Sequence, residues 1–273
     1  MDHLLTLTTT LFILIIGAAI GSFLNVIIYR IPAGKSILFP PSHCPHCQTH
    51  IHWYDNIPVL AWFWLRGKCR HCGGGISWRY PFIEAIAALL FLATFWQFGP
   101  TLTTVGYCLL LSWLLALALI DCDTLTLPNP LTQSGLVAGL VFLLLQGWIE
   151  TTAIEASLSR LITGIFGAVL ALWGLELIAF IGSIFYRRTA MGAGDAKLLA
   201  MIGAWLGWQG AALAAFLGCV GGAFLGGGAI ALGLLNRKQP IPFGPFLALG
   251  AVITVFWGEI IITSYQRLIF GAG

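Results

Sequence analysis

Residues 4–28 read LLTLTTTLFILIIGAAIGSFLNVII, a run without a single charged side chain. A hydrocarbon core about 30 Å thick is crossed by roughly 20 apolar residues in a helix, so this stretch is long enough to span a membrane. Asp2 and His3 precede it and Arg30 follows it, so it lacks the basic leading region and the small-residue cleavage site of a signal peptide. We therefore expect a retained first transmembrane helix.

The composition of the whole chain agrees with that stretch. Its 273 residues are 59% hydrophobic and 8% charged, whereas soluble domains have roughly 45–50% apolar and about 25% charged residues. Intrinsic disorder requires the opposite composition and is excluded. The net charge of +3 is too small to indicate nucleic-acid binding. The sequence predicts an integral membrane protein that contacts lipid.

Seven further apolar stretches predict an all-α polytopic membrane protein with about eight transmembrane helices. Only Trp208-Gln209-Gly210 separates the sixth span from the seventh, so the number of spans is predicted to within one. The expected spans after the first are residues 81–98, 102–120, 131–148, 158–184, 197–213, 214–235 and 243–264.

The basic residues predict the orientation of these spans. With the amino terminus outside, only Arg160 and Arg267 lie on the outer side, as the positive-inside rule favours. Residues 30–80 then form a cytosolic loop, the one sizeable segment outside the membrane. The basic residues expected on the inner side are Arg30, Lys35, Arg66, Lys68, Arg70, Arg79, Arg187, Arg188, Lys197, Arg237 and Lys238.

The loop contains two C-x-x-C pairs, Cys44 with Cys47 and Cys69 with Cys72. Four thiolates suit the tetrahedral coordination of a structural zinc ion. With all four positions filled by protein, the ion has no free position for water or substrate, so we expect no catalytic role for it. Disulfides are the alternative, but the cytosol keeps thiols reduced. A small loop also gains its folding free energy from a bound metal. The nearby histidines are interpreted as polar residues of a solvated domain, and one of them replacing a cysteine is the alternative.

Acidic residues at the ends of spans are the second chemical feature, because ionisable groups in a membrane segment are costly and usually functional. Asp121 and Asp123 end the third span, and Asp195 begins the sixth. All three are expected at the cytosolic face. Two carboxylates in one site do not both ionise easily, so one can activate a water molecule while the other, protonated, polarises a peptide carbonyl. We prefer Asp121 to Asp123, because Asp121 directly continues the hydrophobic run.

Asp195 follows Gly192 and Gly194, whose missing side chains allow a peptide to approach the carboxylate. The alternative interpretation is a turn at the start of a helix with Asp195 as the N-cap. For Asp121 and Asp123 the alternative is a pair of interfacial acids in a solvated loop. Glu84 lies near the beginning of the second span, where it can pair with a basic residue or reach the site.

Several segments together resemble the type IV prepilin peptidases over nearly the whole chain. They are GSFLNVIIYRIP at 21–32, the two cysteine pairs, YDNIP at 54–58, RGKC at 66–69, ISWRYP at 76–81, the segment 121–128 and Gly192-x-Gly194-Asp195. Asn129 stands where the family often has an acid after Leu-Pro, a departure that leaves both expected catalytic positions intact.

The resemblance implies a bifunctional enzyme of the bacterial inner membrane, with its amino terminus in the periplasm. Such an enzyme removes the leader of type IV prepilins or type II secretion pseudopilins, with Asp121 and Asp195 as catalytic aspartates. It then methylates the new amino terminus, typically phenylalanine, with S-adenosylmethionine. The implied organisation is a first helix (1–29), a zinc-knuckle loop associated with methyl transfer (30–80), in which Gly67 and Lys68 are candidate cofactor-binding residues, and a helical protease core (81–273).

Two other classes of protein are compatible with parts of this pattern. In an ion-coupled transporter, Asp121 and Asp195 would carry protons or cations and the zinc loop would be regulatory. However, both acids are expected at one face, and no acid at the middle of the membrane continues a path across it. A zinc-loop scaffold of pilus or secretion machinery would need no aspartates at all.

Overall fold

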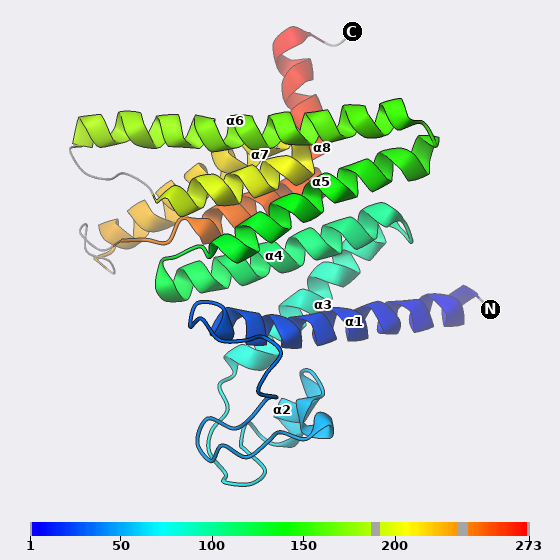
Figure 1. The fold of residues 1–273 in the computed structure, drawn as a ribbon, viewed down its shortest axis with the longest axis vertical. Helices are drawn as coiled ribbons and strands as arrows, with labels where there is room; N and C mark the ends of the chain where they lie inside the picture. Colours follow the sequence, from blue (N-terminus) through cyan, green and yellow to red (C-terminus); the bar gives the residue numbers. More distant parts are fainter. Residues whose placement is uncertain (1, 187–191, 234–239, 272–273) are drawn as a thin grey trace. The chain divides into compact units, whose positions relative to one another are not determined.

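The computed structural model describes residues 2–186, 192–233 and 240–271. In this part of the chain the residues form helices, turns and two isolated β-bridges, and no strand. Figure 1 shows the helices in chain order. They are α1 (Asp2–Arg30), η1 (Trp53–Asn56, a 3₁₀ turn), α2 (Leu60–Trp64), α3 (Arg79–Phe98), α4 (Leu102–Thr124), α5 (Asn129–Thr151), α6 (Ile154–Tyr186), α7 (Ala193–Ala231) and α8 (Gly244–Phe270).

Seven of the described helices are long and apolar enough to cross a membrane, namely α1 and α3 to α8. The predicted all-α polytopic fold is therefore confirmed. Six of the predicted spans coincide with α1, α3, α4, α5, α6 and α8 apart from a few residues at their ends. Four basic residues used to predict the orientation, Arg187, Arg188, Arg237 and Lys238, lie outside the described residues.

The remaining two predicted spans fall largely in α7, which consists of two helical arms joined at Gly207. The last two residues of the predicted span 214–235 lie outside the described residues. Gly207 has φ 69° and ψ 179°, a conformation that side chains disfavour and glycine adopts readily. The break lies just before the predicted Trp208-Gln209-Gly210 boundary, so the first arm ends at Leu206 and not at residue 213. The expected break between two helical stretches is present but lies earlier in the chain, and α7 as a whole is one of the seven candidate spans, a number within one of that predicted.

The two arms of α7 run in opposite directions, as can be followed in Figure 1. A straight helix of this length would be about 58 Å long. However, the start of the first arm, at Asp195, is close enough to Asp121 for the two charges to interact, and Asp121 binds the first residue of α8. The end of the second arm also packs on the start of α8, where Gly222 lies against Phe246. Both ends of α7 therefore lie near the start of α8.

Small residues allow the helices of this bundle to approach closely. A Cβ atom at Gly203 in α7 would lie 2.5 Å from the carbonyl oxygen of Gly167 in α6. A Cβ atom at Gly218 would lie 3.1 Å from the Cα atom of Leu247 in α8, and one at Gly226 would lie 3.1 Å from Ile241. The glycines at 218, 222 and 226, four residues apart, thus serve helix packing, as their spacing predicts.

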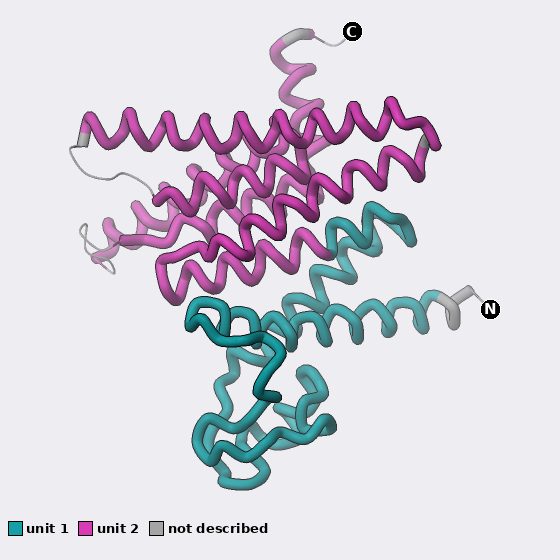
Figure 2. Tube along the Cα trace, viewed as in Figure 1, with its two compact units in different colours: residues 1–108 teal, residues 109–273 magenta. Residues whose placement is uncertain are grey.

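The chain divides into two compact units, residues 1–108 and 109–273, coloured separately in Figure 2. The first contains α1, the cysteine loop and α3, and the second contains most of α4 and all of α5 to α8. Between α1 and α3, only Cys44 and Gly67 of residues 31–78 are buried. The loop therefore has almost no apolar core of its own.

Candidate active site and metal centre

The two cysteine pairs of the first unit fold into equivalent knuckles. In the first, the amide of Cys44 donates to the carbonyl of Thr49 and the amide of Gln48 donates to that of Cys44. In the second, the amide of Cys69 donates to the carbonyl of Gly74, and the amide of Gly73 donates to the carbonyl of Cys69. Antiparallel bridges flank the two turns, His43 with His50 and Lys68 with Gly75.

A positive φ at corresponding positions completes the equivalence of the knuckles. Gln48 has φ 58° and Gly73 has φ 69°. This conformation turns the chain back after each second cysteine, so that both sulfur atoms of a pair face the same side. The equivalence was not apparent from the C-x-x-C spacing alone, because only one of the two turns contains the expected glycine.

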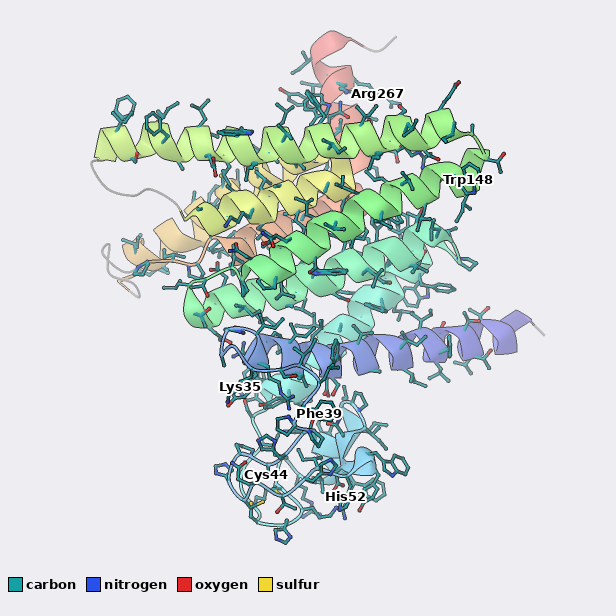
Figure 3. All side chains as sticks on the ribbon, in the orientation of Figure 1. Lys35, Phe39, Cys44, His52, Trp148 and Arg267 are labelled. Carbon is teal, nitrogen blue, oxygen red and sulfur yellow. The ribbon has the colours of Figure 1, made fainter. Side chains whose placement is uncertain are left out.

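The four sulfur atoms lie within 4.8 Å of one another, so the structure brings Cys44, Cys47, Cys69 and Cys72 together. The Sγ atoms of Cys44 and Cys72 are 3.8 Å apart, and those of Cys47 and Cys69 are 4.0 Å apart. A tetrahedral ion with metal–sulfur bonds of about 2.3 Å places its ligands roughly 3.8 Å apart. The cluster therefore fits a four-coordinate metal ion. Figure 3 labels Cys44 in this loop.

The surroundings of the sulfur atoms affect their protonation differently. Hydrogen bonds from Thr49 lower the pKa of the Cys47 thiol to about 6. Backbone amides of Cys72 and His71 lower the pKa of Cys69. At Cys72 the amide of Gly74 also donates to the sulfur, but burial and the neighbouring thiols raise the pKa to about 11. Metal binding requires all four cysteines as thiolates. A bound cation would stabilise their negative charges, including that of Cys72, whose pKa is raised without it.

An ion pair connects the second knuckle to η1. The guanidinium of Arg70 donates three hydrogen bonds to the carboxylate of Asp55, at 2.6 Å, 2.8 Å and 3.1 Å, and lies 5.5 Å from the ring centre of Tyr54. The ring of His52 also stacks on the ring of Tyr54, with 5.2 Å between the ring centres. The YDNIP segment therefore supports the loop structurally.

The structure gives Gly67 a role in a turn. Gly67 has φ 66°, its amide donates to the carbonyl of Trp62, and a Cβ atom there would lie 2.8 Å from the Trp62 ring. Lys68 follows it with an exposed side chain. These contacts explain why a glycine is needed at 67. They do not test cofactor binding, which stays a prediction for both residues.

Asp121 of the second unit continues the buried face of α4. Leu110, Leu114 and Leu117 occupy helical positions in line with it and are at most 1% exposed, and Asp121 itself is 5% exposed. Its Oδ2 atom accepts a hydrogen bond of 2.9 Å from the backbone amide of Gly244, the first residue of α8. The positive end of the α8 dipole thus faces this carboxylate.

Asp123 lies in the last turn of α4 and is exposed. The predicted span stopped at residue 120, but the helix continues to Thr124. A residue two positions after Asp121 lies on another side of the helix, which explains its different environment. The structure therefore separates the two acids.

Asp195 lies in the first turn of α7 and is 9% exposed. The N-cap of this helix is Gly192, whose carbonyl accepts the amide of Asp195 at 3.1 Å, so the alternative of Asp195 as N-cap is wrong. A Cβ atom at Gly194 would lie 3.1 Å from Leu127 in the segment after α4. The charge of Asp121 acts on Asp195, so the two carboxylates share one environment.

Glu84 in α3 is a buried polar residue, for which the sequence left open pairing with a basic residue or a place in the site. One carboxylate oxygen accepts the backbone amide of Val59 at 2.7 Å. Val59 has φ 62°, an unfavourable conformation for a β-branched residue, and this bond holds it there. Glu84 thus fastens the loop to α3 within the first unit. No sequence pattern indicated this contact, because Val59 lies 25 residues before Glu84 in a loop without periodic structure.

These features define a class of protein. It crosses a membrane several times, carries two interacting buried carboxylates at helix ends, and has a four-cysteine centre in a separate loop.

Comparison with known proteins identifies the family. Residues 15–98 match the Bacterial Peptidase A24 N-terminal domain, and residues 108–227 match the Type IV leader peptidase family. Proteins named prepilin leader peptidase/N-methyltransferase are similar along most of the chain. The one from Aeromonas hydrophila is 40% identical over 90% of both chains, and the one from Stutzerimonas stutzeri is 36% identical over 93% of this chain and 92% of its own. No solved structure matches the chain.

The chain belongs to the type IV leader peptidase family and is a peptidase.

Proposed function

We propose that this enzyme cleaves the leader from type IV prepilins with Asp121 and Asp195 as the catalytic pair. The observation that carries the proposal is that two buried carboxylates, from the end of α4 and the start of α7, lie close enough for the charge of Asp121 to act on Asp195. Pseudopilins of type II secretion are substrates of the same chemistry, because they present the same kind of hydrophobic helix after a basic leader.

The mechanism uses the two carboxyl groups in different protonation states. The ionised one removes a proton from a water molecule, whose oxygen attacks the scissile carbonyl carbon. The protonated one donates a hydrogen bond to the carbonyl oxygen. The tetrahedral intermediate collapses as the C–N bond breaks and the leaving amine takes up a proton. We assign the ionised role to Asp121, because the Gly244 amide and the α8 amino terminus stabilise a negative charge there.

The location of the reaction follows from the excess of basic residues on one side. We place the amino terminus in the periplasm and the cysteine loop in the cytosol, in the inner membrane of a bacterium. The acids at the start of α7 and the end of α4 then lie at the cytosolic interface. A prepilin whose helix lies in the bilayer presents its leader junction at that level, so no large soluble cleft is needed.

The second proposed activity is methylation of the new amino terminus, as the names of the relatives indicate. S-Adenosylmethionine, when bound, supplies an activated methyl group for the attacking amine. A structural zinc ion held by Cys44, Cys47, Cys69 and Cys72 would fold the loop. Gly67 and Lys68 remain candidate residues for the methyl-transfer half on the resemblance alone.

The test of the catalytic pair uses purified enzyme and a prepilin, with loss of the leader followed on a gel. We expect Asp121→Asn and Asp195→Asn each to lower the cleavage rate by at least about 100-fold, because each removes a proton-transfer group. Asp123→Asn is the matched control, an exposed aspartate two residues from Asp121, and should cleave normally. Substantial cleavage by either of the first two variants would exclude that residue from the pair.

A further inference from the structure

A cavity of about 510 Å³ lies in the first unit, between the end of α1 and the cysteine loop. Sites for small molecules typically have volumes of about 300–1,000 Å³. The helix contributes one face to it, with residues spaced three or four apart as the helical repeat requires. These are Ala19, Ser22, Phe23, Val26 and Arg30.

The loop forms the opposite wall, which is mostly apolar. Leu38, Pro40 and Ile51 line it, together with the indole of Trp53. A few polar groups interrupt this surface, among them the amide side chain of Asn56. An apolar wall with an aromatic ring and a few polar groups is typical of sites that bind small molecules.

Arg30 is the unusual member of the lining, because its charge is buried without a counter-ion. It is 8% exposed. Its guanidinium donates to the carbonyls of Ser36, at 3.0 Å, and Pro40, at 2.6 Å. Three of its five N–H donors make no bond to a residue in the described ranges, and none of the described carboxylates is paired with it.

A buried guanidinium in this state favours an anionic partner. Two neutral carbonyls and the negative end of the α1 dipole offset part of the charge. A carboxylate would add two parallel charge-assisted hydrogen bonds in the geometry that arginine prefers. The cavity therefore combines a group suited to a carboxylate with a mostly apolar wall, in a volume typical of small-molecule sites.

We propose that this cavity binds the methyl donor, with the carboxylate of S-adenosylmethionine on Arg30 and the adenine against the wall that contains Trp53. This inference rests on the proposed methyltransferase function. The cavity places the ligand beside the metal loop, whose fold forms one of its walls. The lining does not include Gly67 or Lys68.

The test measures binding of two product-like ligands to the full-length enzyme in nanodiscs by calorimetry. S-Adenosylhomocysteine has the carboxylate, and 5′-methylthioadenosine has the adenosine and thioether without the amino-acid end. We expect wild-type enzyme to bind the first at least about 10-fold more tightly, because it alone can form a charged hydrogen bond with Arg30. Arg30→Gln should bind both ligands with similar affinity.

Two further variants complete the design. Lys35→Gln is the matched control, because it removes a positive charge from the same loop outside the cavity, and it should keep the wild-type preference. Figure 3 labels Lys35. Val26→Trp fills the cavity while leaving Arg30 unchanged, and it should weaken binding of both ligands. Together these results would support the assignment.

The outcomes separate this inference from the proposed function. Binding of S-adenosylhomocysteine to Arg30→Gln with an unchanged preference would overturn the cavity assignment, while methyl transfer by this enzyme would stand. Absence of any binding or methyl transfer in wild type would overturn both. An anionic phospholipid that copurifies with wild type and is lost from Val26→Trp, with nucleoside binding unaffected, would assign the cavity to a lipid headgroup and reject the methyl donor.

Discussion

The cysteine loop and the helical bundle of residues 109–273 hold their candidate functional groups in place by different means. In the bundle, Asp121 follows a continuous face of buried leucines, and glycine contacts bring α6, α7 and α8 together. In the loop, almost nothing is buried apart from Cys44 and Gly67. Backbone turns and four sulfur atoms organise the loop, whereas side-chain packing organises the bundle.

The difference indicates how the two proposed activities depend on folding. A segment without an apolar core gains stability mainly from a bound ion. A helical bundle in lipid depends on close packing and on satisfied backbone hydrogen bonds. Loss of the metal should therefore affect the loop and methyl transfer, while the carboxylate pair remains assembled.

The largest expected effect is that of removing a metal ligand. Cys44→Ser should release about one zinc per chain, make residues 31–78 sensitive to protease, and abolish methyl transfer, whereas leader cleavage should retain about half of its rate or more. Metal analysis, limited proteolysis and the two activity assays measure this. Cys219→Ser, which changes an exposed cysteine of α7 outside the cluster, should have no effect. A loop that stays protease-resistant without metal would contradict the comparison.

A change in the bundle should have the opposite selectivity. In Gly244→Ala, the new Cβ atom would lie 2.7 Å from Oδ2 of Asp121 and would displace the carboxylate. We expect cleavage to fall by roughly 100-fold, the usual result of misplacing a catalytic group by about 1 Å. Binding of S-adenosylhomocysteine should remain unchanged. Gly221→Ala, whose Cβ atom would meet only a ring carbon of Phe246 at 3.8 Å, is the control and should cleave normally.

The smallest expected effect concerns the attachment of the loop to α3. Glu84→Gln weakens the hydrogen bond to the Val59 amide by about 1.5 kcal/mol, since the acceptor loses its charge. Hydrogen exchange at Val59 should then be about 10-fold faster, a ratio that corresponds to that free energy. Glu176→Gln, in α6, should leave exchange at Val59 unchanged. Unaltered exchange in Glu84→Gln would show that the turn at Val59 is held by other contacts.

Much of the fold could be predicted from the sequence, because lipid imposes a simple rule on composition and length. Apolar runs identified six helices nearly to their ends. The reversal within α7 was placed too late in the chain, because Gly207 differs from the many other glycines of this region only in its backbone conformation. Hydrophobicity carries no information on φ.

The chemical groups were predictable where their spacing or position is itself the signal. The two C-x-x-C pairs predict a four-cysteine metal site, and acids directly after apolar runs indicate functional carboxylates. Arg30 was counted only as a charge on the inner side, and Glu84 was expected to pair with a basic residue or to reach the site. Their roles depend on contacts with Ser36, Pro40 and Val59, in a loop whose path no periodic pattern specifies. The Gly244 contact to Asp121 is likewise a long-range effect of packing.

The reversal at Gly207 leaves a first arm that is too short to cross a membrane by itself. The first arm of α7, residues 193–206, is about 21 Å long, which is less than the roughly 30 Å of a typical hydrocarbon layer. Its non-helical turn is covered by α6, since a Cβ atom on Gly167 would touch the backbone of Gly207 and Trp208. Residues 195, 196 and 198–205 of this arm are buried within the protein, so other parts of the chain and not lipid surround most of it. A helical arm too short to cross the hydrocarbon layer is tolerated there, because irregular backbone at membrane depth is stable where protein covers it.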